Sequence, residues 1–206
     1  ERDRLRIKYA AGTAGRERLW AAQTDLTRSL DELPAHWQYI DQLYQLLQPL
    51  DGGLALLDVG CGIHSFARLL LLNLSYRLRA QTWNQNQPLR YIGIDFSVAA
   101  LHAAQDATSD ALKHVDRLFS GRISGPTPVS QQWVRGRSVE MLPFADHSFD
   151  RIVANLSLSF SRSPLHALRE LFRVLRPGGK LIVSVITPLA DMALPYRSSL
   201  QELGVD

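Results

Sequence analysis

The chain has 206 residues, 46% of them hydrophobic and 21% charged, which is enough for one domain with a substantial core. The formal net charge is only +3 and the arginines are scattered along the chain, which disfavours a nucleic-acid partner. A single cysteine, Cys61, excludes an internal disulfide. No apolar run approaches about 18 residues. We therefore expect no membrane span, no signal peptide and a cytoplasmic location.

The first fifty residues are predicted to form an arm and a helical cap. Residues 16–30 and the segment that starts at Pro34 both carry apolar residues at helical spacing. Proline suits the first turn of a helix, and the sequence PLDGG (49–53) ends this one. We expect the two helices either to pack on a sheet or to form a lid over a glycine turn at residues 60–62. The predicted division is 1–50 for the arm and cap and 51–206 for the core.

An apolar run from Leu54 to Val59, interrupted only by Asp58, predicts a strand buried on both faces in a parallel sheet. Gly60-Cys61-Gly62 follows directly, and a helical pattern begins soon after it. A strand, a glycine turn and a helix leave free backbone N–H groups facing a ligand at the carboxyl edge of a sheet. Glycine also lets a ligand lie directly against the main chain. The alternative is a tight turn without a ligand.

Strands and helices alternate along the rest of the chain. Further strands are predicted at 91–94, 133–134, 149–156 and 180–186. A helix is predicted at 98–119 with Ser97 as its N-cap, and another from Pro164 to a turn at 176–179. Residues 73–90 are interpreted as a helix end followed by a long loop. The alternation predicts βαβ units and hence an α/β fold with a parallel sheet.

Asp95 stands at the end of the second predicted strand, one unit after the glycine turn. A carboxylate at this edge can accept hydrogen bonds from the 2′ and 3′ hydroxyls of a ribose. The alternative is a helix N-terminal carboxylate beside Ser97. Together with the glycine turn, Asp95 indicates an adenosine-containing ligand. The dinucleotide motif G-x-G-x-x-G needs a third glycine where Ser65 stands, which disfavours a nicotinamide-dependent dehydrogenase.

Four motifs occur in order between residues 54 and 186: LLDVGCG, GIDFS, EMLPFADHSFDRIVANLSL and LRELFRVLRPGGKLIVS. Together they closely resemble the class I S-adenosylmethionine-dependent methyltransferases, in particular the small-molecule group with LPF…SFD and RVLRPGG signatures. The resemblance implies a Rossmann-like open parallel sheet of order 3-2-1-4-5 with helices on both faces and an N-terminal helical cap. It implies S-adenosylmethionine as cofactor, S-adenosylhomocysteine as product and a small-molecule methyl acceptor.

The resemblance also implies which residues hold the methionine part of the cofactor. Gly60, Cys61 and Gly62 would lie under it, and Asp58 would help to place its amino group. Asn155, at the end of the fourth strand, would lie near that amino group and the reacting methyl group.

The adenosine part has its own implied contacts. Asp95 would bind the ribose and Phe96 would lie along the adenine. Ser138, by its side chain, and Val139, by its backbone N–H, would border the adenine edge, with Glu140 as the alternative partner there.

Departures from the family pattern bear on activity. His64 stands where the family usually has glycine, and Ser159-Phe160 stand where histidines are common, so no general base and no catalytic residue is predicted. The six histidines show no ligand spacing, and no metal site is expected. The two strands that would complete the sheet have no counterpart after residue 186, so we expect them to be missing. The alternative function is a catalytically inactive methyltransferase-like domain that serves as a binding or scaffold module. The sequence predicts no oligomeric state.

Overall fold

The structure is a computed structural model that describes residues 33–63, 65–79, 87–118, 129–137 and 139–185. The helix predicted at 16–30 lies outside the described residues, as do His64, Ser138 and the segment 186–206.

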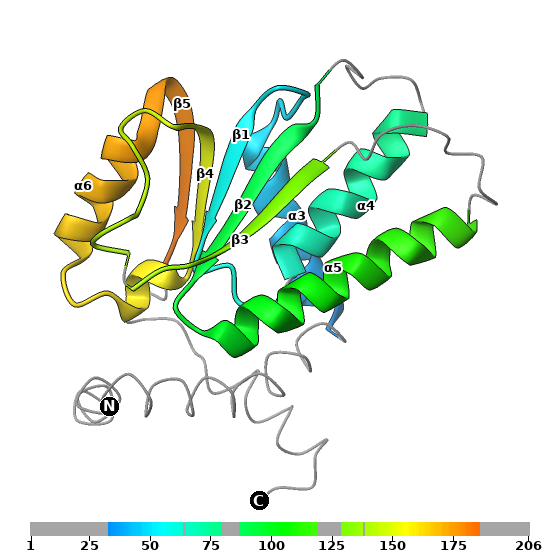
Figure 1. Cartoon of the computed structure of the whole chain (residues 1–206), viewed down its shortest axis with the longest axis horizontal. Helices are drawn as coiled ribbons and strands as arrows, with labels where there is room; N and C mark the ends of the chain where they lie inside the picture. Colours follow the sequence, from blue (N-terminus) through cyan, green and yellow to red (C-terminus); the bar gives the residue numbers. More distant parts are fainter. Residues whose placement is uncertain (1–32, 64, 80–86, 119–128, 138, 186–206) are drawn as a thin grey trace, which may run out of the picture.

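Five strands form one parallel sheet in the order β3-β2-β1-β4-β5, which confirms the predicted order (Figure 1). The strands are β1 (Ala55–Val59), β2 (Leu89–Asp95), β3 (Val129–Arg135), β4 (Phe149–Asn155) and β5 (Leu175–Ser184). Every residue of β1 is buried, because this strand lies in the middle of the sheet with helices on both faces.

The strand register brings the candidate site residues to one level. Asp58 of β1 pairs with Val153 of β4, and on the other side the next residue of β1 pairs with the residue before Asp95. Gly60 therefore lies level with Asp95 and Asn155. Because the strands are parallel, all three residues meet at the carboxyl edge of the sheet.

Helices cover both faces of the sheet, as predicted. α3 (Pro34–Leu47), α4 (Ser65–Arg79) and α5 (Val98–Leu118) lie on one side, and α6 (Pro164–Val174) lies on the other (Figure 1). A short 3₁₀ turn, η1 (Ser157–Phe160), follows β4. None of the helices in the described part of the chain is long and apolar enough to cross a membrane.

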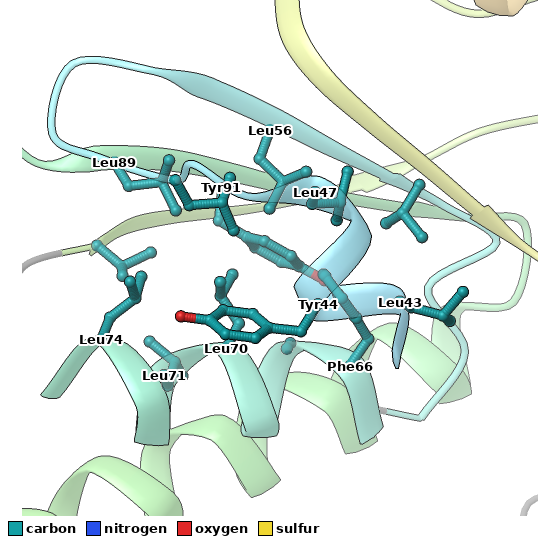
Figure 2. Packing of buried hydrophobic residues seen from close by; sticks show 14 of the residues in the cluster. Leu43, Tyr44, Leu47, Leu56, Phe66, Leu70, Leu71, Leu74, Leu89 and Tyr91 are labelled. Carbon is teal, nitrogen blue, oxygen red and sulfur yellow. The ribbon is translucent and has the colours of Figure 1, made fainter. Parts of the chain in front are cut away.

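Helix α3 belongs to the core and is not a lid. Its buried side chains share one apolar cluster with residues of the sheet and of α4, and Figure 2 shows Tyr44 among the buried side chains of these elements. The buried residues of α3 are Ile40, Leu43, Tyr44 and Leu47. For α3, packing on the sheet is therefore the correct one of the two predicted arrangements.

Arg151 near the amino end of β4, and Lys180, its pairing partner in β5, hold the C-terminal end of α3. Arg151 Nε donates to the carbonyl oxygen of Leu47 at 3.0 Å, and Arg151 Nη2 donates to that of Pro49 at 3.1 Å. Lys180 Nζ donates to the carbonyl oxygen of Gln48. These cations satisfy carbonyl groups at the end of α3 and immediately after it, so this end of the helix is fixed to the sheet.

Some predicted boundaries were wrong. β3 begins at Val129 and not at Trp133, because the exposed residues of this edge strand are polar and hydrophobicity does not mark them. β2 likewise begins at Leu89. The segment 176–179, predicted as a turn, lies inside β5, where the pairing with β4 is irregular. Proline and glycine serve a bulge here and not a loop, with Gly178 at φ +77°.

Truncating a core side chain of α3 tests its place in the core. Leu47 is 0% exposed, whereas its neighbour Leu46 is 56% exposed. We expect Leu47→Ala to lower the free energy of unfolding by about 2–5 kcal/mol, because it leaves a cavity. Leu46→Ala should change it by less than about 0.5 kcal/mol. Urea unfolding followed by circular dichroism measures both, and equally small effects would contradict a core position for α3.

Candidate functional site

The glycine turn after β1 is held against the end of β2. The backbone N–H groups of Gly60 and Cys61 donate to the carbonyl oxygen of Ile94 at 2.8 and 3.2 Å. Gly60 and Gly62 have φ of +68° and +58°, a region that side chains disfavour. A Cβ on Gly60 would lie 2.6 Å from Cβ of Ser157, so the turn fits against η1 only without a side chain. Beside Gly62 the described residues leave more room, because the nearest of their atoms to an added Cβ would be Gly60 O at 3.9 Å.

Asp95 ties the glycine turn to the end of β2. Its Oδ2 accepts the N–H of Gly62 at 3.0 Å and its Oδ1 accepts the N–H of Ser97 at 2.9 Å. Ser97 Oγ accepts the N–H of Ala100 at 3.2 Å, which confirms Ser97 as the N-cap of α5. Burial raises the pKa of Asp95, while backbone N–H groups of Ser97, Gly62 and Phe96 oppose the rise. A carboxylate has about four acceptor positions, so Asp95 can accept further hydrogen bonds.

Asp58 lies buried beneath the turn, at 2% exposure. Its Oδ2 accepts the hydroxyl of Tyr91 at 2.7 Å. Burial raises the pKa of Asp58 to about 7; the Tyr91 hydrogen bond opposes the rise and the charge of Asp95 adds to it. Burial, followed by the charges of Asp58 and Asp95, raises the pKa of the Cys61 thiol well above its ordinary value. The thiol therefore stays protonated, and Cys61 is not an activated nucleophile.

Asn155 forms a hydrogen-bonded cluster at the carboxyl edge of β4 and β5. Its Oδ1 accepts the Tyr39 hydroxyl at 2.5 Å and the Ser184 hydroxyl at 2.7 Å. The Tyr39 hydroxyl oxygen also lies 2.7 Å from Ser184 Oγ, so its one hydrogen is shared between this oxygen and Asn155 Oδ1. The N–H of Leu156 donates to Ser184 Oγ at 3.0 Å. Sequence analysis missed Tyr39 and Ser184. Ser184 stands at a strand end, and the same signal identified Asp95, so sequence analysis could have identified Ser184 as well. No local signal marks Tyr39.

Val139 and Glu140, two of the residues predicted on the adenine side, lie in the connection from β3 to β4. Val139 is half-buried and packs against the apolar cluster on the α6 side of the sheet. Glu140 Oε1 accepts the Ser161 hydroxyl at 2.6 Å and the N–H groups of the next two residues at 2.8 and 3.3 Å. Glu140 thus holds the segment before α6, and its contact with adenine stays a prediction. Phe96 is half-buried directly after β2.

Ser157 carries a buried hydroxyl oxygen that has no hydrogen-bond partner among the described residues. It lies beside Gly60, at the level where β1 and β4 end. A buried polar atom without a partner costs about 1–3 kcal/mol, so such an atom indicates a ligand or water position. With the room beside Gly62 and the acceptor capacity of Asp95, it favours a polar ligand across the glycine turn. No group of three His, Cys, Asp or Glu side chains in the described ranges is arranged to hold a metal ion.

Comparison with known proteins agrees with this geometry. The profile of the methyltransferase domain family matches residues 57–183, which is more than half of the chain. The chain belongs to the methyltransferase domain family. Together with the sheet order β3-β2-β1-β4-β5, the match supports a class I methyltransferase.

Two curated relatives and one solved structure illustrate the similarity of this methyltransferase domain. It is 38% identical over 73 residues to the ubiquinone/menaquinone biosynthesis C-methyltransferase UbiE of Roseobacter denitrificans (35% of this chain, 29% of that protein). It is 29% identical over 152 residues to the malonyl-[acyl-carrier protein] O-methyltransferase of Pectobacterium atrosepticum (74% and 45%). The crystal structure of the [4+2]-cyclase SpnF matches with a TM-score of 0.57 and 26% identity (84% and 60%). The aligned part thus spans less than half the length of these curated relatives.

A pair of glycine variants tests the fit of the turn. Gly60→Ala and Gly62→Ala both force alanine into a left-handed conformation, at about 1–2 kcal/mol each. Only Gly60→Ala adds a clash, because its Cβ would lie 2.6 Å from Cβ of Ser157. We expect Gly60→Ala to lower the free energy of unfolding more than Gly62→Ala does, in parallel urea titrations. Equal losses would contradict the tight contact between the turn and η1.

Asp58 should make stability depend on pH. The ordinary pKa of this carboxyl group is 3.8, and burial raises it to about 7 in the folded protein. The folded state therefore binds the Asp58 proton more tightly than the unfolded state does. The stabilisation of the folded state by this proton is complete below pH 3.8 and is lost as pH rises through 7. The loss amounts to about 4 kcal/mol.

Asp58→Asn removes the titrating group and keeps a similar shape. We expect the free energy of unfolding of the variant to fall less than that of the wild type between about pH 4 and pH 8. Urea unfolding at several pH values measures the difference. Parallel pH profiles for the two proteins would show that Asp58 keeps its ordinary pKa.

Proposed function

We propose that the chain binds S-adenosylmethionine at the carboxyl edge of β1, β2 and β4 and transfers its methyl group to a small-molecule acceptor in the cytoplasm. The observation that carries this proposal is the hydrogen bond from Gly62 N–H to Asp95, because a carboxylate with further acceptor positions beside a glycine turn supports a ribose contact there. Membership of the methyltransferase domain family supports it.

The residues present fit this ligand. S-adenosylmethionine supplies a methyl group on a positively charged sulfur. In the proposal, Asp95 binds the ribose, and the main chain from Gly60 to Gly62 lies under the methionine part, with the buried Asp58 beneath it and Asn155 beside it. Ser157 Oγ lies at the same level and has a free bonding position. Alignment of reactants alone can supply about 7–11 kcal/mol of barrier reduction, so transfer does not require a general base.

On the adenine side, the proposal keeps Phe96 along the ring and Val139 at its edge, with Ser138 or Glu140 as polar partner. Phe96 directly follows the ribose carboxylate and is half-buried, which suits stacking against an adenine. The methyl acceptor is proposed only by class. The relatives are described as a C-methyltransferase of ubiquinone and menaquinone biosynthesis and an O-methyltransferase of malonyl-acyl carrier protein, so carbon and oxygen acceptors both occur among them.

A binding or scaffold module without catalysis is the second candidate. Ser159 and Phe160 stand where histidines are common in the resembling family, which favours this candidate for an acceptor that needs deprotonation. A similar fold is described as a [4+2]-cyclase, and a shared fold does not determine the reaction. Release of S-adenosylhomocysteine from S-adenosylmethionine in the presence of a quinone-type or thioester acceptor separates an enzyme from a module.

Calorimetry with S-adenosylhomocysteine tests the proposed site. We expect the wild type to bind at sub-millimolar ligand, and Asp95→Ala to weaken binding by at least about tenfold, since two hydrogen bonds to a charged acceptor are lost. Unchanged affinity would remove the ribose assignment. Absence of heat with the wild type would overturn the proposal.

Asp150→Ala provides a matched control. Asp150 is a carboxylate at the opposite edge of the sheet, where it accepts the N–H of Ala55 at 2.8 Å and pairs with Arg176 at 2.7 Å. Its loss should lower stability, as the loss of Asp95 should, but should leave the affinity for S-adenosylhomocysteine unchanged.

A further inference from the structure

Tyr39 carries a polar contact from helix α3 to the proposed ligand site. The helix runs along β4 and β5, and its C-terminal end is held by Arg151, near the amino end of β4, and by Lys180, which pairs with Arg151 in β5. Its first half therefore reaches the carboxyl edge, where the Tyr39 hydroxyl contacts Asn155 and Ser184. Tyr39 thus comes to the site from a part of the chain 116 residues away from Asn155.

The cluster fixes the orientation of the Asn155 amide. Ser184 Oγ accepts the N–H of Leu156, which directs the Ser184 hydroxyl hydrogen toward Asn155 Oδ1. Tyr39 donates to the same amide oxygen. With the oxygen engaged by two hydroxyl groups, the amide nitrogen offers its two hydrogens to a ligand. An amide N–H suits a carboxylate oxygen, and the amino-acid end of an S-adenosyl ligand carries one.

The position of Asn155 points to that end of the ligand. Asn155 lies level with Gly60, and the Ser157 hydroxyl without a partner lies beside the same glycine. We infer that Tyr39 and Ser184 are positioning residues that hold the Asn155 amide against the amino-acid end of the bound cofactor. The inference rests on the proposed function, because it presupposes an S-adenosyl ligand at the glycine turn.

Two ligands that differ only in the amino-acid end test the inference. S-adenosylhomocysteine has this end, and 5′-methylthioadenosine keeps the adenosine and the sulfur but lacks it. We expect Tyr39→Phe to weaken S-adenosylhomocysteine about fivefold to tenfold in calorimetry and to leave methylthioadenosine within about twofold, because only the former contacts the Asn155 amide. Tyr44→Phe, a buried tyrosine of the same helix, is the matched control and should change neither affinity.

A double-variant cycle adds a measurement that a merely structural role would not affect. If Tyr39 and Ser184 act through the same amide, Ser184→Ala should have the same ligand selectivity, and the double variant should weaken S-adenosylhomocysteine by less than the product of the two single effects. Equal weakening of both ligands, or of neither, would overturn the inference while the proposed function stands. Failure of the wild type to bind either ligand would overturn the proposed function itself.

Discussion

The hydrogen bond from the Gly62 N–H to the Asp95 carboxylate is the interaction on which the candidate site depends. It joins the loops after two neighbouring strands, and the Gly60 and Cys61 N–H groups strengthen the joint by donating to Ile94 O. Hydrogen bonds to the end of β2 therefore fix the conformation of the turn, and the local preferences of its own residues do not. A half-buried carboxylate with further acceptor positions, held beside the main chain of the glycine turn, is what the proposed ribose contact requires.

Helix α3 is the second constraint, because it is anchored at both ends. Arg151 of β4 and Lys180 of β5 bind carbonyl groups at its C-terminal end, and Tyr39 in its first half reaches the carboxyl edge of the sheet. Between these anchors its apolar side shares the core with β1 and α4. The cap and the core thus share one apolar cluster, and the chain that precedes the glycine turn contributes a group to the site that the turn creates.

Two carboxylates make contacts in the structure other than those that the family resemblance implies. Asp58 belongs to the glycine motif, yet its side chain lies beneath the turn and is bonded to Tyr91, with its pKa raised to about 7 by burial. Glu140, predicted beside adenine, directs one oxygen to the segment that leads into α6. Both carboxylates support the loops around the site, and the roles that the resemblance assigns to them remain proposals.

The sequence by itself determined the features that depend on neighbouring residues. The apolar run of β1, the glycine turn, the Ser97 cap and the place of Asp95 at a strand end follow from local patterning, and the family motifs supplied the sheet order. Only the tertiary structure decided the start of the polar edge strand β3, the bulge inside β5 and the convergence of Tyr39, Asn155 and Ser184. These features depend on contacts between residues far apart in the chain, and no local sequence pattern indicates such contacts.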